Sequence, residues 1–223
     1  MLLNLHTHLL KKQANEQIIF NEIIPDAEEA LEDFELQNTE NWLSAGIHPW
    51  YINEKLSNSQ LKKLAAIAKE PTIKFIGECG LDRLKGSPLS VQEEIFIKQI
   101  RIAEDVRKPV IIHCVRCYNE LISIKKIVRP RVPSVVHGFN TKIEIARQLL
   151  DKGFYLSLGG ALLQEESNAL KVLQEIPLER LFLETDDKDI SIMDIYQKAA
   201  TVKGLSVEEL EKVIFDNYLG LNL

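Results

Sequence analysis

The sequence contains few cysteines, and this scarcity excludes a fold held together by disulfides. Only three of the 223 residues are cysteine, at positions 79, 114 and 117, which is too few and too clustered for a disulfide framework. Cys114 and Cys117 form a C-x-x-C pair that matches half of a redox or zinc motif, but one such pair is weak evidence. Free cysteines are usually buried. We therefore expect three ordinary buried thiols.

The sequence also lacks long apolar runs, a secretory signal and an excess of positive charge. No run of about 18 apolar residues is present, so we expect no membrane span. Without a basic segment followed by an apolar one at the N-terminus, a cytoplasmic location is expected. We also expect a monomer. The formal net charge of −6 argues against a broad basic surface for nucleic acid. Two bound divalent cations would make a site locally positive, so an anionic phosphodiester substrate is not excluded.

Apolar runs alternate with helical patterns along almost the whole chain. The length of 223 residues and the 45% hydrophobic content fit one soluble domain over residues 1–223. Strands are predicted near residues 2–8, 17–24, 43–48, 73–78, 109–114, 134–138, 154–158 and 180–185. Helices are predicted at about 26–38, 57–69, 90–107, 117–128, 141–151, 164–176, 190–203 and from 206 onward.

Strands separated by single helices pair in parallel through right-handed crossovers. Eight such units predict an α/β fold, a (β/α)8 barrel of the TIM type. Residues 9–16 are too few for a full crossover helix, so we predict a slightly trimmed barrel whose first helix is short or absent. An open doubly wound sheet is the structural alternative. Two capping boxes are predicted, Ser90 with Glu93 and Ser206 with Glu209.

All five histidines lie at the ends of predicted strands, where α/β barrels build metal sites. The strand ends carry His6 and His8, His48, His113 and His137, and carboxylates end two more strands at Glu78 and at Glu184 and Asp186. His6 and His8 are two residues apart and so face the same side of a strand, as two ligands of one metal require. Surface histidines are a poor explanation here, because Leu2, Leu3 and Leu5 mark a buried strand.

Each of the other residues has a structural explanation when it is taken alone. Glu78 could belong to an ion pair, although the glycines around it favour a loop that approaches a metal closely. His113 and His137 could be buried core histidines, and Asp186 could be a helix N-cap. Six independent accidents would be needed to explain the whole set.

The order of these motifs resembles a known family. The motifs are His-x-His, Gly-Ile-His-Pro-Trp, Gly-Glu-x-Gly-Leu-Asp, Pro-Val-x-Ile-His, His-Gly-Phe and Glu-Thr-Asp. Together they are similar to the TatD-like hydrolases, metal-dependent deoxyribonucleases of the amidohydrolase superfamily. The resemblance extends from Leu5 to Gly220.

The resemblance implies a role for each residue in a site with two divalent metal ions. It implies that His6 and His8 bind the more buried ion, that Glu78 contacts both ions and that His113 and His137 bind the second. Asp186 is implied as a ligand and as the catalytic base, and His48 as a substrate contact. Arg116 is predicted to bind a substrate phosphate, because a guanidinium matches phosphate geometry. Glu184 is expected to support a ligand.

The predicted ligand set agrees with elementary metal chemistry. Imidazoles mixed with carboxylates suit Zn, Mn or Fe, and Mg where carboxylates and water dominate. Two such ions polarise a phosphoryl oxygen and lower the pKa of a water between them. Asp186 could then orient that water and accept its proton.

Two departures from the family pattern bear on the substrate. Asn4 stands where the family usually has an acidic residue, which predicts the loss of a charge behind the ligands but not of a ligand. After Asp186 the chain continues Asp187-Lys188-Asp189, without the usual proline and aromatic residue. The loop that shapes the substrate site is therefore expected to differ.

Three functions remain open on the sequence. The first is a phosphodiester hydrolase that acts on DNA, at 3′ or 5′ ends. The second keeps the metals but acts on a small amide, lactone or phosphoester. The third is a metal-binding protein without catalysis. It would predict that some ligand residues are replaced by residues that cannot bind metal, and no ligand position is replaced in this way.

Overall fold

A computed structural model describes residues 1–10, 15–37 and 39–221 of the chain. These residues form two compact units. The terminal half comprises the described residues of 1–20 together with those from 135 onward, and the central half comprises residues 21–134. The single domain expected over residues 1–223 stays a prediction.

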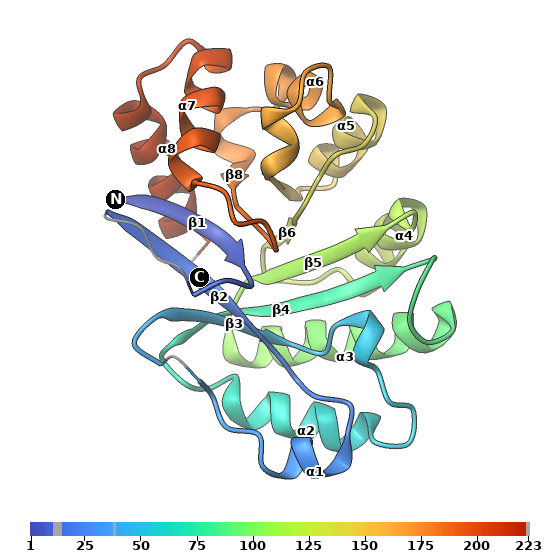
Figure 1. Cartoon of the computed structure of the whole chain (residues 1–223). Helices are drawn as coiled ribbons and strands as arrows, with labels where there is room; N and C mark the ends of the chain where they lie inside the picture. The colour runs from blue at the N-terminus through green and yellow to red at the C-terminus, as the bar shows by residue number, and fades with distance from the viewer. Residues whose placement is uncertain (11–14, 38, 222–223) are drawn as a thin grey trace. The chain divides into compact units, whose positions relative to one another are not determined.

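The terminal half contains the first and the last strands of the chain (Figure 1). Strands β1 (Leu2–Thr7) and β2 (Glu16–Ile23) open the chain, and the last three residues of β2 belong to the central half. Strands β6 (Ser134–Val136), β7 (Tyr155–Leu158) and β8 (Leu181–Leu183) follow. Its helices are α5 (Ile143–Asp151), η2 (Gly160–Leu163), α6 (Asn168–Glu175), η3 (Leu178–Arg180), α7 (Ile192–Lys203) and α8 (Val207–Gly220).

Parallel pairing brings the two ends of the chain together in the terminal half. β1 pairs with β2 from Leu2 opposite Glu16, and β7 pairs with both β6 and β8. On its other side, β1 forms a parallel bridge to the segment after β8, with Thr7 opposite Asp186. The first and last strands are therefore neighbours, as in a closed barrel and unlike an open doubly wound sheet. The predicted (β/α)8 fold class is confirmed, with strands in the order β1 to β8.

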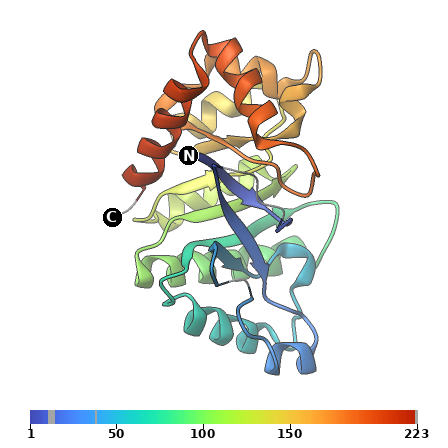
Figure 2. The same cartoon turned by 60° about the vertical axis from the view of Figure 1, so that its left-hand side comes forward.

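Helices α7 and α8 pack beside each other and against β1 and β8 (Figure 2). Tyr196 of α7 is fully buried, and its hydroxyl donates to the carbonyl of Leu3 (2.9 Å) and accepts from the Leu3 amide (3.2 Å). One side chain thereby satisfies both backbone groups of a buried strand residue. This contact fixes the strand that carries His6.

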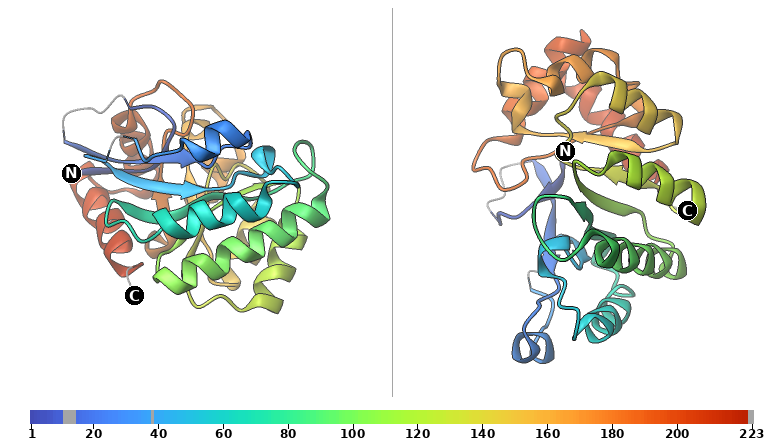
Figure 3. Two further views of the ribbon diagram at one scale, coloured as in Figure 1. Left: turned by 90° about the horizontal axis from the view of Figure 1, so that it is seen from below. Right: turned by 90° about the vertical axis from the view of Figure 1, so that its right-hand side faces the viewer.

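The central half is built around one long strand. Its strands are β3 (Trp42–Gly46), β4 (Ile73–Asp82) and β5 (Val110–Val115), and its helices are α1 (Glu28–Glu32), η1 (Pro49–Tyr51), α2 (Ser57–Ile67), α3 (Leu89–Val106) and α4 (Tyr118–Val128). β4 pairs in parallel with β3 on one side and β5 on the other. Helix α3 packs along β4 and lies beside α2 (Figure 3). β4 extends to Asp82, four residues beyond the predicted end.

Local signals placed most elements correctly but failed at the start of one helix. Ser206 and Glu209 form the predicted capping box. The box predicted for Ser90 and Glu93 is wrong, because α3 begins at Leu89 and Ser90 lies inside its first turn, with Pro88 as the N-cap. Pro88 presets the extended backbone there, and its carbonyl accepts from the amides of Val91 and Gln92.

Helix α1 is shorter than predicted. It spans Glu28–Glu32, whereas the sequence predicted a helix over 26–38, a range that includes residue 38 outside the described residues. Glu32, Asp33 and Glu35 place negative charge at its C-terminal end, where the helix dipole disfavours it. The prediction that the first crossover helix is short or absent concerns residues 9–16, of which 11–14 also lie outside the described residues.

The three cysteines and the helices agree with two further expectations. All three thiols are free and buried, and burial raises the pKa of Cys79 and Cys114 far above the ordinary value, so both stay protonated. Within the described part of the chain, no helix has the length and apolar character that a membrane span requires.

The Tyr196 contact leads to a prediction about stability. Tyr196→Phe leaves the amide and carbonyl of Leu3 without their buried partner, and we expect the free energy of unfolding to fall by about 1–3 kcal/mol. Tyr155→Phe is the matched control, because no hydrogen bond is described for that hydroxyl, and it should change stability by less than about 0.5 kcal/mol. Urea unfolding of both variants measures the difference. Equal effects would contradict the role given to Tyr196.

Candidate metal centre

The backbone ladder between β1 and the end of β8 assembles one group of candidate ligands in the terminal half. The His8 amide donates to the carbonyl of Asp186 (3.1 Å), and the Asp186 amide donates to the carbonyl of His6 (3.0 Å). Side chains on paired parallel strands at matching heights lie next to each other. Residues 180 positions apart in the chain are thus brought together by main-chain hydrogen bonds.

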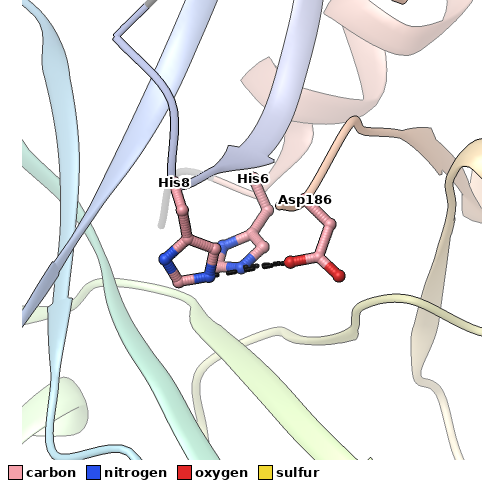
Figure 4. A group of neighbouring side chains, drawn as sticks. All are labelled: His6, His8 and Asp186. Atoms are coloured by element: carbon pink, nitrogen blue, oxygen red, sulfur yellow. Dashed lines mark ion pairs between the residues drawn. The ribbon is translucent and has the colours of Figure 1, made fainter. Parts of the chain in front are cut away.

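Both imidazoles of this group face the carboxylate of Asp186 (Figure 4). Nε2 of His6 and Nε2 of His8 lie 3.7 and 3.6 Å from Oδ1 of Asp186. These separations exceed a hydrogen bond. Two donors of one tetrahedral Zn²⁺ ion, each about 2.1 Å from it, would be about 3.4 Å apart. The three side chains are therefore spaced as ligands of a single cation.

His137 and Glu184 extend this group. The ring of His137 lies 4.4 Å from that of His6, centroid to centroid, and Nδ1 of His137 lies 3.3 Å from Oε1 of Glu184. The Gly138 amide donates to the same carboxylate oxygen at 2.6 Å. Burial alone would raise the pKa of Glu184, but the hydrogen bond and the charge of His137 hold the pKa below the ordinary value. Glu184 thus positions His137, as expected for a carboxylate that supports a ligand.

The charge that Asn4 does not supply is present on the next strand. The Asn4 amide donates to Oε1 of Glu16 (2.9 Å) and to the hydroxyl of Thr185 (2.8 Å), and its oxygen accepts from the Thr185 amide (3.1 Å). Glu16 is buried. The carboxylate of Glu16 therefore lies beside Asn4, and Asn4 in turn bonds Thr185, the residue before Asp186.

A second group of candidate ligands lies in the central half, around Glu78. Oε1 of this buried carboxylate lies 2.7 Å from Nδ1 of His113 and 3.1 Å from Nε2 of His48. The second nitrogen of His113 lies 3.2 Å from Oδ2 of Asp82. A neutral imidazole donates through one nitrogen only. Both nitrogens of His113 face carboxylates, so the arrangement gathers negative charge that a bound divalent ion would balance.

Asp82 and Trp50 belong to this group although the sequence analysis assigned them no role. The Trp50 indole donates to Oδ2 of Asp82 (2.6 Å), and the Leu84 amide donates to Oδ1 (2.8 Å). Burial alone would raise the pKa of Asp82, but these hydrogen bonds and His113 hold it below the ordinary value. Strand periodicity could have found Asp82, which is four residues after Glu78 and so on the same face of β4.

Buried amides hold the second group in place from behind. On α3, Gln92 bonds the amide (2.7 Å) and carbonyl (2.9 Å) of Asp82, and Gln99 bonds those of Ile47 (2.7 and 3.0 Å). On β2, the oxygen of Asn21 accepts from the amide of Glu78 (2.7 Å). One helix face and one strand thereby fix the backbone beside His48, Glu78 and His113. No sequence pattern marks these amides, since a single Gln or Asn carries no metal signature.

The predicted residues thus divide between the two halves. His6, His8, His137 and Asp186 lie together in the terminal half, and His48, Glu78 and His113 lie together in the central half. His48 is buried against Glu78, and Arg116 is exposed just after β5. Several roles stay predictions. They are the substrate contact by His48, the phosphate contact by Arg116, and the two shared-ion roles: Glu78 contacting both ions, and His113 binding the same ion as His137. In both groups the donor set and its spacing fit a divalent metal ion.

A pocket of about 460 Å³ opens beside Asp186 within the terminal half. Its lining includes Phe139, Asn140, Leu163, Gln164, Lys188 and Ile190. Asp186 is about a third exposed (36%), so its carboxylate is accessible to water from this side. A small organic group would fit a pocket of this size and mixed lining.

Comparisons with known proteins agree on one family. A family model described as "TatD related DNase" matches residues 9–221. The chain is 31% identical over 194 residues to an uncharacterised metal-dependent hydrolase, YcfH, of Escherichia coli strain K12, covering 80% of this chain and 72% of that protein. It is 33% identical over 166 residues to the 3′-5′ ssDNA/RNA exonuclease TatD of Cronobacter turicensis, covering 72% and 62% respectively.

A solved structure confirms the fold. The crystal structure of YjjV, a TatD homologue from Escherichia coli K12, superposes with a TM-score of 0.82 at 21% identity, covering 99% of this chain and 97% of that one. An identity this low is informative about the fold and not about the substrate.

Gly80, two residues after Glu78, gives a prediction that tests how closely β4 and β5 approach each other at the site. A Cβ on Gly80 would lie 2.1 Å from the carbonyl oxygen of His113, at a φ of +145°. We expect Gly80→Ala to lower the free energy of unfolding by more than about 4 kcal/mol. In Gly204→Ala the φ is also positive (+68°) but no atom lies within 4 Å, so the cost should be only about 1–2 kcal/mol. Similar losses in thermal unfolding would refute the close approach.

Proposed function

Because the chain belongs to the TatD related DNase family, we propose that it hydrolyses phosphodiester bonds in nucleic acid with the help of divalent metal ions. Metal-dependent hydrolysis is the activity of the family, and relatives are named as a 3′-5′ ssDNA/RNA exonuclease and a deoxyribonuclease. The observation that carries the proposal is the triad of His6, His8 and Asp186. Its donors are spaced for one cation, and its carboxylate borders an accessible pocket.

The proposed ligands are the six residues predicted from the sequence. His6, His8 and Asp186 would hold one ion in the terminal half. Glu78 and His113 would hold another in the central half. His137 would be a further donor. Bound divalent ions supply the Lewis acidity that polarises a phosphoryl oxygen and acidifies water. Imidazole-rich donor sets favour Zn, Mn or Fe over Mg. A cytoplasmic location and a monomeric state stay predictions from the sequence.

Asp186 is proposed as the proton acceptor. Oδ1 of this residue faces the two imidazoles, whereas the side chain as a whole is partly open to the pocket. A general base must reach the proton that it removes. Glu184 is buried and bonded to His137 and to the Gly138 amide, so it serves to orient a ligand and not to accept a proton from solvent.

The pocket beside Asp186 favours a second candidate function, hydrolysis of a small amide, lactone or phosphoester. Phe139, Leu163 and Ile190 give it an apolar wall, and Lys188 adds one cation. A wall of this kind suits the body of a small organic substrate. In this case a lactone or phosphomonoester, and not an oligonucleotide, would be the best substrate in a panel assayed with the same metal ions.

The proposal predicts a metal-restored nuclease activity that depends on Asp186. Chelator-treated protein should cleave labelled single-stranded DNA when Mg, Mn or Zn is returned. Asp186→Asn should lower the rate by about 100-fold or more, because a positioned general base contributes about 10²–10⁴. Asp151→Asn is the matched control, since Asp151 is an exposed carboxylate at the end of α5 that does not line the pocket beside Asp186, and its rate should stay within about twofold of the wild type.

Two results would count against this proposal. Absence of DNA cleavage with every metal, while calorimetry still shows metal binding, would contradict phosphodiester hydrolysis and favour the small-substrate function. Equal rates for Asp186→Asn and the wild type would refute Asp186 as the base but leave the nuclease activity standing.

A further inference from the structure

We propose that Trp50 is a base-stacking residue and that Lys85 contacts the adjoining phosphate, so that the central half holds a single-stranded nucleic acid at the edge of the Glu78 group. The inference rests on the proposed phosphodiesterase function and identifies residues that select a nucleic acid over a small ester. The stacking platform is defined by Trp50, with Tyr51 beside it in η1.

Trp50 is both exposed and joined to the candidate ligands. It is 38% exposed, as is Tyr51. Its indole nitrogen is bonded to Asp82, and its ring lies 4.8 Å from that of His48 and 5.8 Å from that of His113. Large exposed aromatics are costly to leave in water. A base stacked on Trp50 would therefore lie within one nucleotide of the residues proposed to hold metal.

Lys85 marks the face of the indole that is open to a partner. Its ammonium lies 3.7 Å from the centre of the Trp50 ring, in a cation–π contact. Lys85 is exposed, so this face of the indole is covered by a surface side chain and not by the core. An incoming base would displace the ammonium, which then stays close enough to reach the phosphate of the same nucleotide.

Further positive charge follows Asp82, the partner of Trp50, along the chain, although the chain as a whole is acidic. Arg83 and Arg116 are both exposed, and Nε of Arg83 donates to the carbonyl of Arg116 (3.0 Å). Arg83 also pairs with Glu120, which leaves Lys85 and Arg116 as the cations with no acidic partner described. The net charge of −6 would repel a polyanion elsewhere, so a local group of cations directs where the strand binds.

Stacking aromatics next to cations are how proteins bind single strands without reading their sequence. A small lactone or phosphomonoester has no base to stack and no second phosphate for Lys85. The platform therefore favours the nucleic-acid function over the small-substrate function. Arg116, predicted as a phosphate contact, is linked to the residue after Asp82 through the bond from Arg83 to its carbonyl.

The first test measures stacking directly, without turnover. The chain has two tryptophans, so Trp42→Phe leaves Trp50 as the only tryptophan signal. The variant, loaded with Mg, is titrated with a phosphorothioate oligothymidylate, which resists cleavage. We expect saturable quenching of Trp50 emission, and we expect Lys85→Gln to reduce the salt dependence of binding by about one charge. Unquenched emission while a labelled oligomer still binds would overturn the platform.

The second test compares two substrates that differ only in their bases. Wild-type protein should cleave oligothymidylate about tenfold or more faster, in kcat/KM, than an abasic strand of the same length, because stacking contributes that much per base. Trp50→Ala should abolish this preference, and Trp50→Phe should keep most of it because a ring remains. Trp42→Phe is the control, since Trp42 has no part in the site, and its preference should match that of the wild type.

The outcomes separate this inference from the function on which it rests. If the wild type cleaves neither strand, the nuclease proposal fails, and the quenching titration alone then decides the platform. If both strands are cleaved but Trp50→Ala retains the preference, the platform is wrong and the nuclease stands. If Trp50→Phe and Trp50→Ala lose activity equally on both strands, Trp50 acts only through Asp82, and stacking is refuted.

Discussion

The main-chain hydrogen bonds between β1 and the end of β8 are the constraint on which the terminal half depends. They make the first and last strands neighbours, and they set His6, His8 and Asp186 at one height. Backbone groups of buried strands must be paired, so the ligand geometry follows from a requirement of the fold itself. Tyr196 reinforces it by bonding both backbone groups of Leu3. The chemistry is thus located where the chain must close.

Buried charge is the second organising feature. Glu78, Asp82 and Glu184 are each nearly or fully buried, and each lies within 3.3 Å of an imidazole. An isolated buried carboxylate is costly, so these side chains persist only with cations beside them. A divalent ion beside them would meet that need, because its charge is fixed and larger than that of one side chain. The electrostatics of these buried carboxylates therefore favour the binding of a metal ion.

Neutral amides supply the rigidity that charged ligands alone do not. Four buried amide side chains form hydrogen bonds to backbone or side chains beside a ligand. They are Gln92 and Gln99 from α3, Asn21 from β2 and Asn4 from β1. Short buried side chains with several hydrogen bonds have one orientation. A site held in this way keeps its spacing through binding and release of substrate, which a hydrolase needs for repeated turnover.

The sequence by itself determined the fold class and the identity of the candidate ligands, because strand and helix periodicities are local and because histidines at strand ends have few other uses. It also placed the Ser206 capping box, which depends on residues three apart. Tertiary structure alone decided that Asp82 and Trp50 join His113, that Glu16 supplies a carboxylate beside Asn4, and that α3 begins at Leu89. These outcomes depend on contacts between strands and helices that are far apart in the chain. The physical reason is that a buried polar group bonds to whichever partner lies near it in space, and no local sequence pattern encodes that distance.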